Sequence, residues 1–91
     1  MIVLKTNREL ALMREACIIS AGALKLAGEA VEPGVTTAEI DKIAYDYIIK
    51  CGAKPNFLNY NGYPATACIS INDEVIHGIP SKKRVIEEGD I

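Results

Sequence analysis

A chain of 91 residues, 49% of them hydrophobic, can form one small packed domain and is too short for two. Its ten basic and twelve acidic residues are interspersed and give a net charge of −2, which excludes the basic face that nucleic-acid binding requires. Three widely spaced cysteines without a CxxC pair argue against a disulfide framework or a zinc ribbon. The cysteine pattern therefore indicates a reducing compartment, and we expect the cytoplasm. We also expect no membrane span.

The first predicted helix runs from about residue 7 to Val31. Thr6 and Glu9 have the spacing of a capping box, in which each side chain accepts the backbone N–H of the other residue. Glu-Pro-Gly at 32–34 should end the helix, and Ile2-Val3-Leu4 before it indicates a short strand or a docking segment. One stripe of mostly small residues should face a neighbouring element: Met13, Ala16, Cys17, Ser20, Leu24 and Ala27.

A second helix is predicted after the same type of cap, with Thr36 as N-cap and Glu39 three residues later. Gly52 is placed to end it. Its apolar residues follow the helical period: Ile40, Ile43, Ala44, Tyr47 and Ile48.

The remainder of the chain predicts a loop and strands. Residues 53–64 form an aromatic loop rich in Asn, Gly and Pro, and the β-type runs 65–72 and 74–79 predict an antiparallel hairpin that turns at Asn72-Asp73. Residues 87–91 predict a turn and the beginning of a further strand, so we expect an open sheet edge and self-association through it. Helices followed by strands indicate an α+β fold, here a single partial domain over residues 1–91.

The residues alone leave the chemistry open. No HExxH or EF-hand spacing is present, the acidic residues are scattered, and no nucleophile elbow surrounds Ser70. Tyr60, Tyr63, Cys68 and His77 could line one concavity if the loop folds over the hairpin, and Cys68 could pair with His77. The alternative, in which the tyrosines cover a sheet and His77 is an ordinary edge residue, fits the residues better.

A longer stretch of the sequence favours the functional interpretation of these residues. The block NYNGYPATACISINDEVIHGIP, residues 59–80, closely resembles the corresponding block of type I methionine aminopeptidases, as do VEPGVTTAEID at 31–41 and EEGDI at 87–91. The resemblance covers essentially the whole chain. It implies the pita-bread fold, an α+β sheet enclosed by helices and built from two similar halves, of which residues 1–91 would be the N-terminal part.

The resemblance also implies an activity. The family removes the initiator methionine from nascent proteins, and two divalent metal ions (Co, Mn, Fe or Zn) activate the water that attacks the first peptide bond. His77 matches the histidine that approaches the substrate and stabilises the reacting amide, and it is not a metal ligand. Tyr60, Tyr63 and Cys68 match residues that line the methionine pocket, and Phe57 stands where some relatives carry cysteine.

The family's metal ligands, two Asp, one His and two Glu, lie beyond the position of Ile91. We therefore expect this chain to be a fragment that binds no metal and is inactive alone. Its expected partner is the N-terminal methionine of nascent polypeptides, near the ribosome, with no direct binding of nucleic acid or membrane. Two alternatives stay open: a non-catalytic half-domain that binds peptides or a partner chain, and one subunit of a split aminopeptidase.

Overall fold

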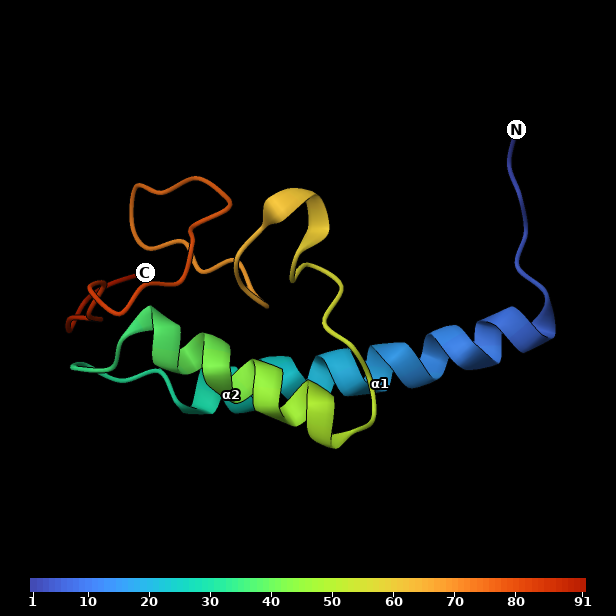
Figure 1. Ribbon diagram of the computed structural model, residues 1–91, viewed down its shortest axis with the longest axis horizontal. Helices are drawn as coiled ribbons and strands as arrows, with labels where there is room; N and C mark the ends of the chain where they lie inside the picture. Colours follow the sequence, from blue (N-terminus) through green and yellow to red (C-terminus); the bar gives the residue numbers. More distant parts are fainter.

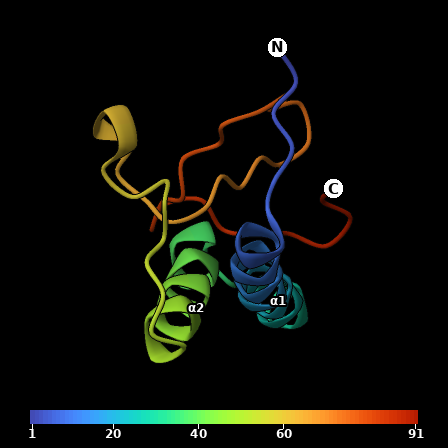
Figure 2. The ribbon, with the colours of Figure 1, turned by 90° about the vertical axis from the view of Figure 1, so that its right-hand side faces the viewer.

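The computed structural model describes residues 1–91. It contains two helices, α1 (Asn7–Glu29) and α2 (Thr37–Lys50), and one short 3₁₀ turn, η1 (Tyr60–Gly62). The helices run antiparallel side by side, and the chain after α2 lies over one side of the pair (Figure 1). Figure 2 shows the same arrangement end-on, with the N-terminal residues standing clear of the helices.

Both helices begin at the capping boxes that the sequence predicts. The hydroxyl oxygen of Thr6 accepts the Glu9 N–H at 3.2 Å, and the Glu9 carboxylate accepts the Thr6 N–H at 2.7 Å. Thr36 and Glu39 repeat this exchange at 3.2 and 2.8 Å. These side chains satisfy N–H groups that have no partner within a helix, so each start is determined by residues close in sequence.

The helix ends also follow the sequence closely. The first helix ends at Glu29, two residues before the predicted end, and Gly34 takes a φ of +95° in the turn that follows. After Lys50, Gly52 has a φ of +77°, the left-handed conformation in which glycine commonly ends a helix.

The predicted contact face of α1 is mostly wrong. Of that stripe only Ala27 packs against the buried core, whereas Met13 and Leu24 are 47% and 76% exposed. Gly22 faces α2, because the ring of Tyr47 lies directly against it, and the next residue, Ala23, is buried. A Cβ atom on Gly22 would collide with that ring. The absence of a side chain at Gly22 therefore determines which face of α1 packs against α2.

The inward face of α2 agrees with the prediction. Ile40 and Ala44 are buried, and Ile43, Tyr47 and Ile48 are half-buried. Ile40 forms a small core with Ile71 and Ile86 from the last part of the chain. Only nine of the 91 residues are buried, so the hydrophobic stabilisation of this chain is small for its length.

The predicted β-hairpin of residues 65–79 is wrong, because no strand forms in the structure. Two backbone hydrogen bonds join its two arms: the Glu74 N–H closes the turn by donating to the Ile71 carbonyl oxygen at 3.1 Å, and beyond the turn the Ile69 N–H donates to the Gly78 carbonyl oxygen at 2.8 Å. The next donors go to side chains: the Gly78 N–H donates to Ser70 Oγ at 2.9 Å, and the Ile71 N–H donates to the Glu74 carboxylate at 3.1 Å. A β-ladder would use these N–H groups for its repeating backbone hydrogen bonds. The pairing of the two arms therefore does not extend beyond the bond between Ile69 and Gly78.

The last residues also form no strand. Residues 88–89 make the predicted turn, and the Asn72 N–H donates to the Ile91 carbonyl oxygen at 2.7 Å while the Ile91 N–H donates to the Asn72 side chain at 3.0 Å. The single sheet-like contact is an antiparallel bridge between Thr36 and Val85. The expected open sheet edge is therefore absent, because its donors and acceptors are used in turns.

The N-terminal segment Ile2–Leu4 is not a strand, and its side chains are exposed. Its alternative role as a docking segment stays a prediction. Neither helix is long and apolar enough to cross a membrane.

Two glycine substitutions in α1 test the packing of the helix pair. We expect Gly22→Ala to lower the free energy of unfolding by about 1–3 kcal/mol, because the added methyl group displaces the Tyr47 ring. The matched control is Gly28→Ala, where nothing lies within 4 Å of the added atom and where helix propensity should raise stability by about 0.5–1 kcal/mol. Urea unfolding measures both, and equal stability of the two variants would contradict this packing.

Candidate functional site

The aromatic loop turns so that one tyrosine faces inward and the other faces solvent. Asn59 and Asn61 have left-handed φ values of 67° and 48°, which asparagine tolerates, and the Asn59 N–H donates to the Tyr63 carbonyl oxygen at 2.8 Å. Tyr60, at the start of η1, is 66% exposed. Tyr63 is half-buried, and its ring meets that of Phe57 edge to face with centroids 6.3 Å apart.

The Tyr63 hydroxyl connects three segments of the site. It donates to the Ala67 carbonyl oxygen at 2.9 Å and lies 3.4 Å from the Gly78 carbonyl oxygen. Burial, the neighbouring Cys68 side chain and the negative charge of Asp41 raise the pKa of Tyr63 to about 12. Tyr63 is therefore a neutral hydrogen-bond donor throughout the physiological pH range.

Asp41 on α2 is a residue that the sequence analysis missed. Its Oδ1 atom accepts the Thr66 N–H at 3.0 Å and the Ala67 N–H at 2.7 Å. The sequence does contain a signal for it, because position 41 follows buried Thr37 by four residues and precedes buried Ala44 by three. A carboxylate on the inward face of a helix needs hydrogen-bond donors from another segment.

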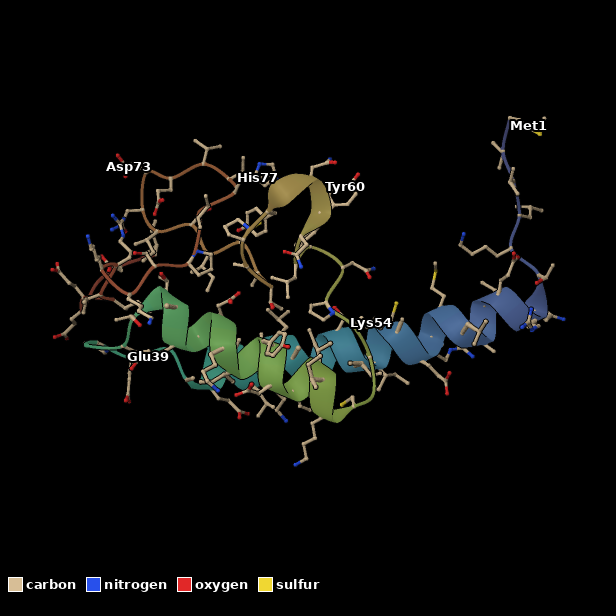
Figure 3. All side chains as sticks on the ribbon, viewed as in Figure 1. Met1, Glu39, Lys54, Tyr60, Asp73 and His77 are labelled. Carbon is tan, nitrogen blue, oxygen red and sulfur yellow. The ribbon has the colours of Figure 1, made fainter.

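His77 lies at the tip of the loop that leads from Asp73 towards η1 (Figure 3). It is exposed, its imidazole makes no hydrogen bond, and its φ of +59° is rarely adopted by residues with a side chain. The next residue, Gly78, packs so closely against the backbone of Ile69 that a Cβ atom on Gly78 would collide with it. This contact restrains the backbone beside His77. Strain of this kind persists only where the surrounding contacts enforce it, and it often accompanies function.

The structure brings together part of the predicted site. Phe57, Tyr63 and Cys68 contact one another through the Tyr63 side chain, and His77 adjoins this group through Gly78. Tyr60 points to solvent, and the Cys68 side chain lies near the Tyr63 hydroxyl and makes no hydrogen bond to His77. The roles of these residues stay predictions.

A separate open groove of about 450 Å³ lies between α1 and residues 53–57. Ala16, Cys17 and Ser20 line its α1 wall, and Ile48 of α2 also lines it, so the small residues of the predicted stripe face this groove. Phe57 is the only predicted site residue that lines it.

The residues of this chain do not form a metal site. Nowhere do three His, Cys, Asp or Glu side chains gather closely enough to hold an ion. Asp41 Oδ1 accepts two backbone N–H groups, and the His77 imidazole makes no hydrogen bond to a carboxylate. We therefore derive no catalytic step through a metal from these residues.

The arrangement of helices and loops is that of a known enzyme family. Residues 11–91 match the sequence profile of metallopeptidase family M24, and the chain belongs to this family. Similar proteins are methionine aminopeptidases: that of Clostridium acetobutylicum is 52% identical over 100% of this chain and 36% of its own length. Methionine aminopeptidase 1 of Bacillus subtilis is 46% identical over the same shares.

Two solved structures of methionine aminopeptidases also superpose closely on this chain. The methionine aminopeptidase from Thermotoga maritima superposes with a TM-score of 0.96 at 37% identity, over 100% of this chain and 36% of that one. The enzyme from Rickettsia prowazekii gives 0.93 at 37% identity, over 99% and 36%. The chain thus has the fold of part of these pita-bread enzymes, without the predicted hairpin, and it spans 36% of the length of the relatives it matches.

The raised pKa of Tyr63 predicts a loss of stability at high pH. Between about pH 10 and about pH 12 the unfolded tyrosine ionises while the folded one keeps its proton, so the unfolding free energy falls as pH rises. Tyr63→Phe should flatten this fall, and at neutral pH it should cost about 1 kcal/mol through the lost bond to Ala67. Urea unfolding across this pH range measures both effects.

The matched control is Tyr60→Phe, whose side chain is 66% exposed and bonds to nothing. It should leave the unfolding free energy at neutral pH unchanged. A Tyr63→Phe variant with the same alkaline slope as the unmodified chain would show that Tyr63 does not keep its proton in the folded state.

Proposed function

We propose that residues 1–91 are the N-terminal part of a cytoplasmic methionine aminopeptidase, which hydrolyses the first peptide bond of nascent proteins and releases the initiator methionine. The observation that carries the proposal is the 52% identity to a methionine aminopeptidase along the entire chain. The block at 59–80, with His77, Gly78 and the pocket residues, lies within this alignment.

The exposed apolar surface supports the same proposal. Leu10, Leu12 and Ile18 on the first half of α1 are 48%, 54% and 64% exposed, and Val75 beside the site is 95% exposed. Many large apolar side chains left exposed on one short chain are consistent with contact to another part of a protein. In the proposed enzyme they would pack against the rest of the polypeptide.

His77 would contact the substrate. Its imidazole is exposed and uncommitted, while its backbone is held through Gly78 by Ser70 and Ile69. A positioned imidazole can hydrogen-bond to the reacting amide and stabilise the charge that develops on it in the transition state. The rigid backbone and the free side chain together suit this role.

The methionine side chain would lie against Tyr63, Phe57 and Cys68. Aromatic ring edges and a thiol make a polarizable, mostly apolar surface, which favours a thioether. Tyr60, on the solvent side of η1, would form the rim of this pocket.

Two divalent ions, which the family resemblance implies, would supply the activated water in the complete enzyme. The proposal places their ligands outside residues 1–91, because no three ligand-type side chains gather within this chain. Action on nascent chains would place the enzyme near the ribosome. Self-association of the 91-residue chain stays a prediction, now through exposed apolar side chains rather than a sheet edge.

The first test is His77→Ala in the complete aminopeptidase. We expect kcat for a methionyl peptide to fall about 10²–10³-fold, the loss typical of one positioned hydrogen-bond donor. Steady-state hydrolysis of a Met-Ala-Ser peptide measures it. The control is Ile76→Ala, the exposed neighbour of His77, which should leave kcat unchanged. An unchanged kcat in both variants would make His77 an ordinary loop residue.

The second test concerns metal binding. Titration calorimetry of the 91-residue chain with Co²⁺ or Mn²⁺ should give no high-affinity binding, since its acidic residues and His77 do not converge. The complete enzyme, as the positive control, should bind both ions. Stoichiometric tight binding by residues 1–91 alone would place a metal site within this chain and overturn this part of the proposal.

A further inference from the structure

We infer that Asp41 is a positioning residue for the methionine pocket: from α2 its carboxylate holds the peptide groups of Thr66 and Ala67 and thereby sets Tyr63 and Cys68 in place. The inference rests on the proposed function, because it concerns the shape of the same pocket. Asp41 itself would contact neither substrate nor metal.

The contact is short and joins segments far apart in sequence. One carboxylate oxygen accepts two successive backbone N–H groups, at 3.0 Å from Thr66 and at 2.7 Å from Ala67, and these residues follow Asp41 by 25 and 26 positions. Hydrogen bonds to an ionised acceptor are stronger than bonds between neutral groups. The site is partly buried, so water competes less for these donors.

These two N–H groups have no other acceptor. Residues 65–68 belong to no helix or strand, and the Thr66 and Ala67 N–H groups have no backbone acceptor. Without the carboxylate, two partly buried donors would be left without a partner, which costs more than the bonds themselves contribute. The local chain would have to move to reach water.

That movement would reach the pocket through one residue, Ala67. Ala67 receives the Asp41 bond at its N–H and the Tyr63 hydroxyl at its carbonyl oxygen, 2.9 Å away. The next residue is Cys68, whose side chain lies near the same hydroxyl and contributes to its raised pKa. A shift of Ala67 therefore displaces both pocket walls. The Tyr63 hydroxyl also lies 3.4 Å from the Gly78 carbonyl oxygen, so a smaller shift would reach the neighbour of His77.

Asp41 is well placed for this role because the residues of α2 on either side of it are buried. Thr37 and Ala44, one turn to either side, are 1% and 7% exposed. The carboxylate thus extends from a packed helix face to a loop that lacks regular structure of its own.

The test uses the complete, metal-loaded aminopeptidase with Asp41→Ala and Asp41→Asn. For Asp41→Ala we expect KM for a methionyl peptide to rise about 10–100-fold, with a smaller fall in kcat. Preference for methionine over norleucine at the peptide N-terminus should fall as well, because the polarizable wall is displaced. Asp41→Asn keeps an accepting oxygen and loses the charge, so it should restore most of the KM and of the preference.

The matched control is Asp46→Asn, on the same helix. Asp46 is exposed and pairs with Lys42 at 2.6 Å, away from the loop. The KM of the Asp46→Asn enzyme and its preference for methionine over norleucine should equal those of the unmodified enzyme. A purely structural role of Asp41 would reduce the amount of active enzyme and leave KM and preference unchanged in the active fraction.

The outcomes separate the two proposals. If the unmodified enzyme releases methionine and both Asp41 variants keep its KM and its preference, the positioning role is wrong and the proposed function stands. If the unmodified enzyme releases no methionine, the proposed function fails, and the role of Asp41 in a methionine pocket fails with it. If Asp41→Ala does not fold, the positioning role is tested by comparing Asp41→Asn with Asp46→Asn. The KM of Asp41→Asn should then be about 3–10-fold higher than that of Asp46→Asn, because the charge on residue 41 is lost.

Discussion

The inward face of α2 holds together a chain whose last forty residues form only one short 3₁₀ turn, η1, and no strand. Thr37, 1% exposed, exchanges hydrogen bonds with the backbone of Ser81, accepting at 2.9 Å and donating at 3.3 Å, and its own N–H donates to the Arg84 carbonyl oxygen at 3.0 Å. Ile40 adds the apolar contact with Ile71 and Ile86. Irregular backbone has few internal bonds, so these anchors on one helix determine where the loops lie.

The candidate site depends on the same helix. Asp41 fixes the segment that carries Cys68, and Tyr63 extends that constraint to the carbonyl group beside His77. His77 itself stays exposed on a backbone with a left-handed φ of 59°. The site therefore combines a restrained backbone with one free imidazole, which suits a group that must meet a substrate from outside the chain.

The residues of the site differ in how far the sequence could reveal them. His77 and Gly78 stand in a long block that resembles one enzyme family, and the family assignment for residues 11–91 agrees with it. Asp41 escaped notice because an acidic residue on a helix is usually solvated, and only its place between Thr37 and Ala44 hinted at burial. The separation of Tyr60 from Tyr63 depends on the turn conformations of Asn59 and Asn61, which composition alone does not specify.

The sequence by itself determined the two helices, because their capping boxes and terminal glycines act within a few residues of each other. Tertiary structure decided which face of α1 meets α2, since the Tyr47 ring fits only where Gly22 leaves space. It also decided that residues 65–79 stay irregular. Their β-type composition favours strands, but strands need partners, and here the Gly78 and Ile71 N–H groups bond to side chains instead of a ladder.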